Sequence, residues 1–72
     1  MQQYSLTIKA NKRPETLERI LRVIRHRGFN VISLNVESND TTFHLHFVLE
    51  SPREIELLTH QLEKLFDIIE IN

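Results

Sequence analysis

The 72-residue chain has no cysteine and no tryptophan, and it contains only one glycine and two prolines. Without cysteine it can form neither a disulfide nor a thiolate metal site. A single glycine excludes a glycine-rich loop that cradles phosphate. Nine Lys and Arg stand against ten Asp and Glu, a net charge of -1. That balance argues against general affinity for nucleic acid or membrane surfaces, which needs a strong positive bias.

Long hydrophobic runs are also missing. No apolar stretch approaches the roughly 20 residues that cross a bilayer, and the start of the chain lacks the pattern of a signal peptide. A cytoplasmic protein is therefore expected.

The chain also has no recognisable nucleophile–His–acid set and no plausible pair of buried carboxylates, so we expect no catalysis by this chain alone. A chain of this length buries only about 60% of its unfolded surface, so association with further chains would stabilise it.

The first part of the chain is typical of a strand followed by a helix. From Tyr4 to Ala10, apolar and polar residues alternate, which indicates a half-buried strand. A polar loop, Asn11–Arg13, leads to Pro14, which suits the first position of a helix because its missing N–H would have no partner there. Gly28 is the expected end of this helix. Apolar residues at helical spacing are expected to face the core, namely Leu17, Ile20, Leu21 and Ile24.

A hairpin is expected next, with Asn39-Asp40 as its turn. Both residues tolerate positive φ, so a two-residue loop is predicted. That loop sets three apolar cross-strand pairs on the core face, Val36–Phe43, Leu34–Leu45 and Ile32–Phe47. The other face then pairs polar residues, Asn35 with His44 and Ser33 with His46. A slip of one residue would place the apolar sets on opposite faces.

The last third of the chain predicts a second helix and a final strand. Ser51-Pro52-Arg53-Glu54 has the pattern of a capping box with Ser51 as N-cap. The apolar stripe that follows comprises Ile55, Leu58, Leu62 and Leu65. Residues 67–71 form the last strand, in which Ile69 and Ile71 flank Glu70. This order of elements predicts the α+β class and a ferredoxin-like βαββαβ sandwich, a four-stranded antiparallel sheet with two helices on one face. A single domain is expected over residues 1–72.

Three segments in a fixed order carry a family resemblance. They are ETLERILRVIRHRGFNVISLNVES at 15–38, SPR at 51–53 and QLEKLFDI at 61–68. The chain thereby resembles ACT domains and, more narrowly, the small regulatory subunits of acetolactate synthase of the isozyme II type. In that family the first segment contains a helix with the pattern LxRV, followed by Arg-Gly and an aromatic residue, then an asparagine and a strand. The resemblance covers roughly residues 6–71.

The resemblance implies a regulatory role without an active site. Such subunits bind a large catalytic subunit and raise its activity. That partner is expected to carry thiamine diphosphate, Mg and FAD, and to condense pyruvate with a second 2-keto acid in the biosynthesis of valine, leucine and isoleucine. No cofactor is expected on this chain.

The resemblance also implies a vestigial effector site. In many relatives valine binds between two ACT domains near the loop after the first strand. Asn11 and Lys12 lie near that loop, and Asn30 matches the family's asparagine after RG-aromatic. Glu15, however, stands where valine-responsive relatives have glycine. It lacks glycine's backbone freedom, and its charge repels a carboxylate, so we expect insensitivity to valine.

Other side chains leave alternatives open. The basic face of the first helix, Arg19, Arg22, Arg25 and Arg27, is either a docking surface for the catalytic subunit or a solvated face with Glu15–Arg19 and Glu18–Arg22 pairs. His44 and His46 share a face but lack a convergent third ligand, so no metal is expected. RNA-recognition domains share the topology but place aromatics on the open sheet face, and here that face has none.

For assembly we expect a homodimer, with the first strand and the loop Asn11–Glu15 near the contact. Two further functions remain as alternatives. One is a free-standing ACT module that binds a small amino acid and regulates another partner. The other is a purely structural assembly domain.

Overall fold

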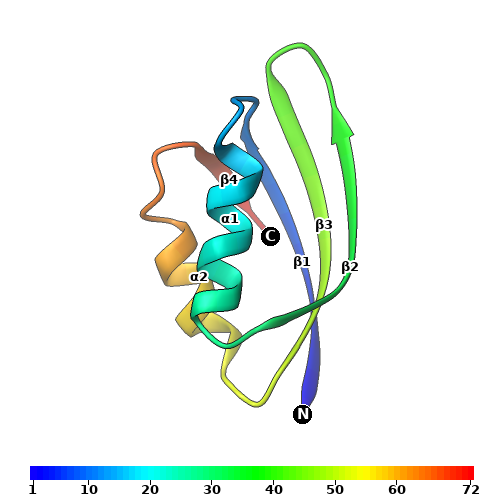
Figure 1. The fold of residues 1–72 in the computed structure, drawn as a ribbon, viewed down its shortest axis with the longest axis vertical. Coiled ribbons are helices and arrows are strands. Elements are labelled where there is room, and N and C mark those ends of the chain that lie inside the picture. Colours follow the sequence, from blue (N-terminus) through cyan, green and yellow to red (C-terminus); the bar gives the residue numbers. More distant parts are fainter.

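Four antiparallel strands form one sheet, and two helices lie on one of its faces (Figure 1). The structure is a computed structural model that describes residues 1–72. Along the chain the elements are β1 (Gln2–Asn11), α1 (Thr16–His26), β2 (Asn30–Ser38), β3 (Thr42–Ser51), α2 (Ile55–Leu62) and β4 (Ile68–Ile71). The strands lie in the order β2-β3-β1-β4. The expected βαββαβ sandwich is confirmed.

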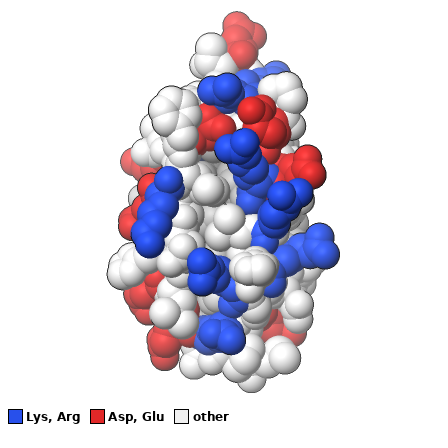
Figure 2. Space-filling view, turned by 60° about the vertical axis from the view of Figure 1, so that its left-hand side comes forward, with Lys and Arg blue, Asp and Glu red and all other residues white.

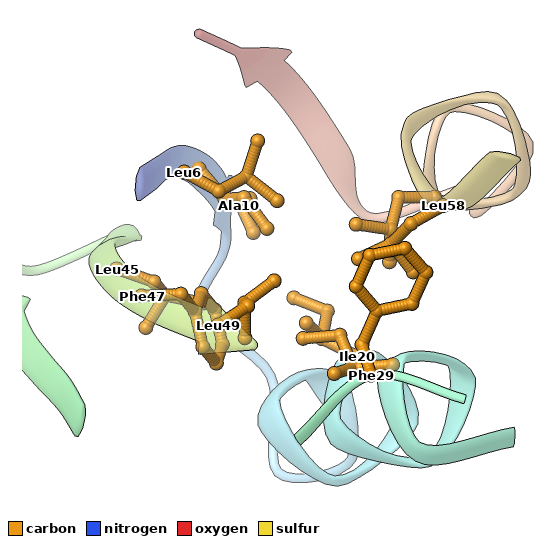
Figure 3. Packing of buried hydrophobic residues seen from close by; sticks show 11 residues of the cluster. Leu6, Ala10, Ile20, Phe29, Leu45, Phe47, Leu49 and Leu58 are labelled. Atoms are coloured by element: carbon orange, nitrogen blue, oxygen red, sulfur yellow. The ribbon is translucent and has the colours of Figure 1, made fainter. Parts of the chain in front are cut away.

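The core lies between the helices and the inner strands (Figure 3). Eleven buried apolar side chains form one cluster. The strands β1 and β3 contribute alternate residues, because successive side chains of a strand point to opposite faces. The helices contribute Ile20, Ile24, Leu58 and Leu62, as the helical spacing predicts. The strand residues are Leu6, Ile8 and Ala10 of β1 and Leu45, Phe47 and Leu49 of β3, and Phe29 completes the cluster.

The outer strand β2 corrects one expectation. Its apolar residues were expected to be buried, but Ile32 is 49% exposed and Val36 43% exposed, and Leu34 is only partly buried. The reason is position: β2 is at the edge of the sheet, and Figure 1 shows both helices over the other strands. The alternation of apolar residues identified the face correctly but not whether a helix covers it.

The hairpin between β2 and β3 has a different register from the one expected. Val36 lies opposite Leu45, and Leu34 lies opposite Phe47, so every predicted pair is displaced by two residues. Ile32 falls at a β-bulge between Val31 and Ser33. A displacement of two keeps each side chain on its face, so the apolar pattern cannot detect it. The closing pair is Ser38 and Phe43, which leaves a four-residue loop.

The expected positive φ at the hairpin turn is absent, since Gly28 alone has one. Asn39 instead closes the loop with its side chain. Its Oδ1 accepts hydrogen bonds from the backbone N–H groups of Thr41 and Thr42, at 3.1 and 2.9 Å, and from the Thr42 hydroxyl at 2.8 Å. An asparagine that binds its own following backbone makes a turn without left-handed residues.

The starts of both helices and the pattern of the last strand differ from the sequence expectations. The helix α1 begins at Thr16, after a turn at Pro14 and Glu15, rather than at Pro14. The helix α2 begins at Ile55 with no side-chain cap, so the predicted capping box is wrong; Ser51 is the last residue of β3. In β4 a bulge brings Ile68 and Ile71 against the core and leaves Ile69 half exposed, instead of the expected alternation of Ile69 and Ile71.

Candidate functional site

The end of β1 and the loop that leads from it to α1 carry three of the four expected effector residues, Asn11, Lys12 and Glu15. Their polar groups already have partners within the chain. The Nδ2 of Asn11 donates to Asp67 Oδ1 at 3.5 Å, and the Lys12 Nζ donates to the Asn39 carbonyl at 3.2 Å. The backbone N–H of Asn11 also donates to the Asp67 carbonyl, at 2.8 Å. The loop is therefore fixed to both the hairpin and the start of β4.

Asp67 is the central group of this region, and the sequence analysis did not identify it. It is 8% exposed. Its Oδ2 accepts a hydrogen bond from the buried Thr16 hydroxyl at 3.5 Å, and its Oδ1 lies 3.8 Å from the Arg13 guanidinium. A buried carboxylate is retained only with such partners. The sequence placed this residue at the first position of the expected last strand, and nothing there linked it to a loop more than fifty residues earlier.

Glu15 makes a different contact from the one expected. Its carboxylate lies 3.9 Å from the Arg13 Nε, and the expected ion pair with Arg19 is absent. Arg13 is thus placed between two carboxylates, those of Glu15 and Asp67. The positive charge of the Arg13 guanidinium is therefore largely balanced by these two carboxylates of the same chain.

Asn30 lies at the opposite end of the sheet from this loop. It pairs with Glu50 of β3, whereas Asn11 pairs with Thr42. Eight residues of β3 separate those positions, which is about 27 Å at about 3.4 Å per residue. One copy of the chain does not bring Asn30 together with Asn11, Lys12 and Glu15. An effector site that uses all four residues requires two copies.

The expected docking arginines are all exposed, three on α1 and the fourth, Arg27, directly after it. Arg22 pairs with Glu18 at 3.4 Å, as the spacing of four residues predicts. Arg19 and Arg25 have no carboxylate partner. Arg27 follows the last turn of α1 and donates to Gln61 Oε1 of α2 at 3.0 Å. A shallow hollow of about 760 Å³ runs along this helix, with Leu17 and Leu21 at its base.

The open face of the sheet is polar. His46 lies there with Nδ1 3.1 Å from the Thr7 hydroxyl, and His44 pairs across the sheet with Lys9 and Glu37. No group of three or more His, Cys, Asp or Glu side chains is arranged to hold a metal ion. Neither helix has the length and apolar character needed to cross a membrane.

One titratable group has an altered environment. The Tyr4 phenol donates a 2.7 Å hydrogen bond to the Arg53 carbonyl. Desolvation, and then the charges of Glu54 and Glu56, raise the pKa of this phenol above its ordinary value. Tyr4 therefore remains a hydrogen-bond donor that joins the start of β1 to the segment before α2.

Comparison with known proteins adds to this geometry. Residues 12–71 match the ACT domain family. The chain is 42% identical over 73 residues to the acetolactate synthase isozyme 2 small subunit of Escherichia coli strain K12, covering 99% of this chain and 84% of that protein. The Shigella flexneri protein of the same name matches to the same extent.

Solved structures share the fold at low identity. The acetolactate synthase small subunit of Thermotoga maritima superposes with a TM-score of 0.86 at 17% identity, over 100% of this chain and 47% of that one. The ACT domain of a GTP pyrophosphokinase from Chlorobium tepidum superposes with a TM-score of 0.85 at 14% identity, over 97% of this chain and 94% of that one. These two likenesses show the fold alone.

Proposed function

The chain belongs to the ACT domain family and, within it, to the small subunits of acetolactate synthase, and we propose that it activates the catalytic large subunit of that enzyme. The observation that carries the proposal is the 42% identity over 99% of the chain to a named small subunit. The catalytic partner would hold thiamine diphosphate, Mg and FAD, with none on this chain. The pathway would be branched-chain amino-acid biosynthesis in the cytoplasm. Nucleic acid and membranes are not proposed as partners.

Reconstitution tests this proposal. The purified chain is mixed with the catalytic large subunit, and acetolactate formation is measured as the small subunit is titrated. We expect a rate that rises and saturates with small-subunit concentration. No increase at saturation would overturn the proposal and favour a free-standing ACT module with another partner. The buried variant Leu45→Asp, which places an unpaired charge in the core, serves as an inactive control.

The proposed activator is insensitive to valine. Two arrangements in the loop between β1 and α1 support this. Glu15 adds a negative charge where the bound amino acid's carboxylate would approach, and Asp67 engages the side chains of Asn11, Arg13 and Thr16. An external carboxylate would have to compete with an internal one that is held by the fold.

A homodimer through β2 is part of the proposal. The strand β1 pairs with β3 along its whole length and with β4 over its second half, whereas β2 pairs on one side only and offers the longest free edge. Its half-exposed Val31, Ile32 and Val36 would be covered by a second copy. Antiparallel pairing of two β2 edges would bring Asn30 of one copy toward the hairpin of the other, where Lys12 contacts Asn39.

Sedimentation at about hundred-micromolar concentration tests the dimer. We expect the wild type to sediment as a dimer and Val36→Lys as a monomer, because a charge at this edge opposes strand pairing. A matched variant, Thr7→Lys, adds the same charge on the open face of the central strand β1 and should remain a dimer. A wild type that is monomeric at this concentration would contradict the assignment.

A further inference from the structure

The two helices enclose a hollow that the effector loop does not touch. It has a volume of about 350 Å³, and its lining includes the cations Arg22, Arg27 and Lys64 together with His26. A second hollow of about 280 Å³ shares His26 and Arg27 and adds Arg53. We call these two adjoining hollows the interhelix cleft.

All charged side chains that line the interhelix cleft are basic. No Asp or Glu is among its lining residues, although the chain as a whole has a net charge of -1. Arg27, Arg53 and Lys64 form no ion pair, and Arg22 pairs only with the exposed Glu18. Figure 2, which looks onto the side of the molecule that holds the helices, shows Lys and Arg gathered along the centre and right of this face.

Arg27 is held in place across the cleft. Its guanidinium donates to Gln61 of α2 at 3.0 Å, and a guanidinium has further N–H donors that can bind a carboxylate. A fixed guanidinium loses less conformational entropy on binding than a free one. A side chain held this way without a carboxylate partner favours an anion supplied from outside the chain.

Apolar groups in the cleft identify the kind of anion. Val23 and Leu65 are partly buried beside the cations, and Leu57 is 50% exposed at the other end. No aromatic side chain is present to stack on a base, and bases of single-stranded nucleic acid bind mainly by such stacking. This lining is complementary to an occupant with both carboxylates and apolar side chains, as in an acidic protein segment.

We propose that the interhelix cleft docks an acidic segment of the catalytic large subunit. This inference rests on the proposed function and narrows the docking surface from the whole basic face of α1 to the side that meets α2. Arg27, Arg53 and Lys64 bind the partner's carboxylates, and Leu57 packs against its apolar side chains. Arg19, which lies outside the cleft lining, is not required.

The test separates docking from activation. The fluorescently labelled small subunit is titrated with the catalytic large subunit, and anisotropy reports binding while acetolactate formation reports activation. The variants are Arg27→Gln combined with Lys64→Gln, and Lys64→Gln alone. Lys9→Gln is the matched control, since it removes the same charge from the open face of the sheet. Sedimentation of each variant alone shows whether the charge change alters self-association.

We expect the double variant to bind about tenfold more weakly, because each exposed charge pair contributes up to about fivefold. Lys64→Gln alone should lose part of that affinity, and Lys9→Gln should lose none. Raising the salt concentration should reduce the difference in affinity between the wild type and the double variant. Maximal activation at saturation should remain.

If the wild type binds and both cleft variants bind equally well, the docking inference is wrong while the proposed function stands. If the wild type neither binds nor activates, both fail. A change in self-association alone would assign the cleft to a second copy and overturn the inference.

Discussion

The hydroxyl of Ser51 donates a 2.9 Å hydrogen bond to the carbonyl of Gly28, although 23 residues separate them in the chain. The same hydroxyl accepts a hydrogen bond from the backbone N–H of Arg53 at 3.0 Å. The end of β3 is thereby joined to the turn after α1. The segment SPR is thus in direct contact with the RGFN part of the first segment that carries the family resemblance, which gives their joint presence a structural reason.

Ser51→Ala is predicted to destabilise the domain by about 1–2 kcal/mol. Ser51 is 1% exposed, so the substitution removes both hydrogen bonds of a buried hydroxyl, the one to the Gly28 carbonyl and the one from the Arg53 N–H. For a domain of this size that corresponds to a fall in Tm of very roughly 4–16 °C, measured by circular dichroism. Ser5→Ala, on an exposed position of β1, should change Tm little. Equal melting temperatures for the two variants would contradict the role of this hydrogen bond.

Gly28→Ala is predicted to destabilise the domain for two separable reasons. Gly28 has φ of +86°, which an alanine adopts only with strain, and an added Cβ would lie 2.9 Å from the Arg53 Nε. We expect a total cost of about 1–3 kcal/mol. In an Arg53→Ala background the steric part disappears and the backbone part remains. A double-mutant cycle from urea denaturation measures the difference, and a coupling of zero would show that Arg53 moves aside freely.

Asn39→Gly distinguishes the observed hairpin loop from the two-residue loop that the sequence indicated. A loop with positive φ would be stabilised by glycine. In the observed loop the Asn39 side chain accepts three hydrogen bonds, so Asn39→Gly should destabilise by about 1 kcal/mol. The Asp40 side chain makes no hydrogen bond, so Asp40→Gly is the comparison. Cross-strand nuclear Overhauser effects between Val36 and Leu45 would confirm the register directly.

The sequence predicted elements and faces well because each depends on local periodicity. The spacing of Ile20 and Ile24 on α1, and of Leu45 and Phe47 on β3, directly indicates which side chains are buried. What it did not predict depends on the arrangement of distant parts. Leu34 and Val36 have the same pattern as core residues, but they lie on an edge strand that the helices leave largely uncovered.

The residues of the candidate sites also divide into those that local sequence spacing indicates and those that only the folded chain brings together. The basic residues of α1 were identified from sequence because they share one helix. Asp67 was missed because its partners, Asn11, Arg13 and Thr16, come from the other end of the chain. Lys64 and Arg53 were missed as neighbours of Arg27 because only the packing of α2 against α1 brings them together.

Valine is predicted not to inhibit the reconstituted enzyme at millimolar concentration, and Glu15→Gly is predicted to move binding toward measurable affinity. At about 4 Å, like-charge repulsion at a surface is of order 1 kcal/mol or more, and each 1.4 kcal/mol is tenfold in affinity. Removing the charge and restoring backbone freedom should together strengthen binding at least about tenfold. Glu15→Gln removes the charge alone, so its effect in titration calorimetry separates the two contributions. The gain remains incomplete because Asp67 still engages Arg13 and Thr16. Tight valine binding by the wild type would show that neither carboxylate blocks the site.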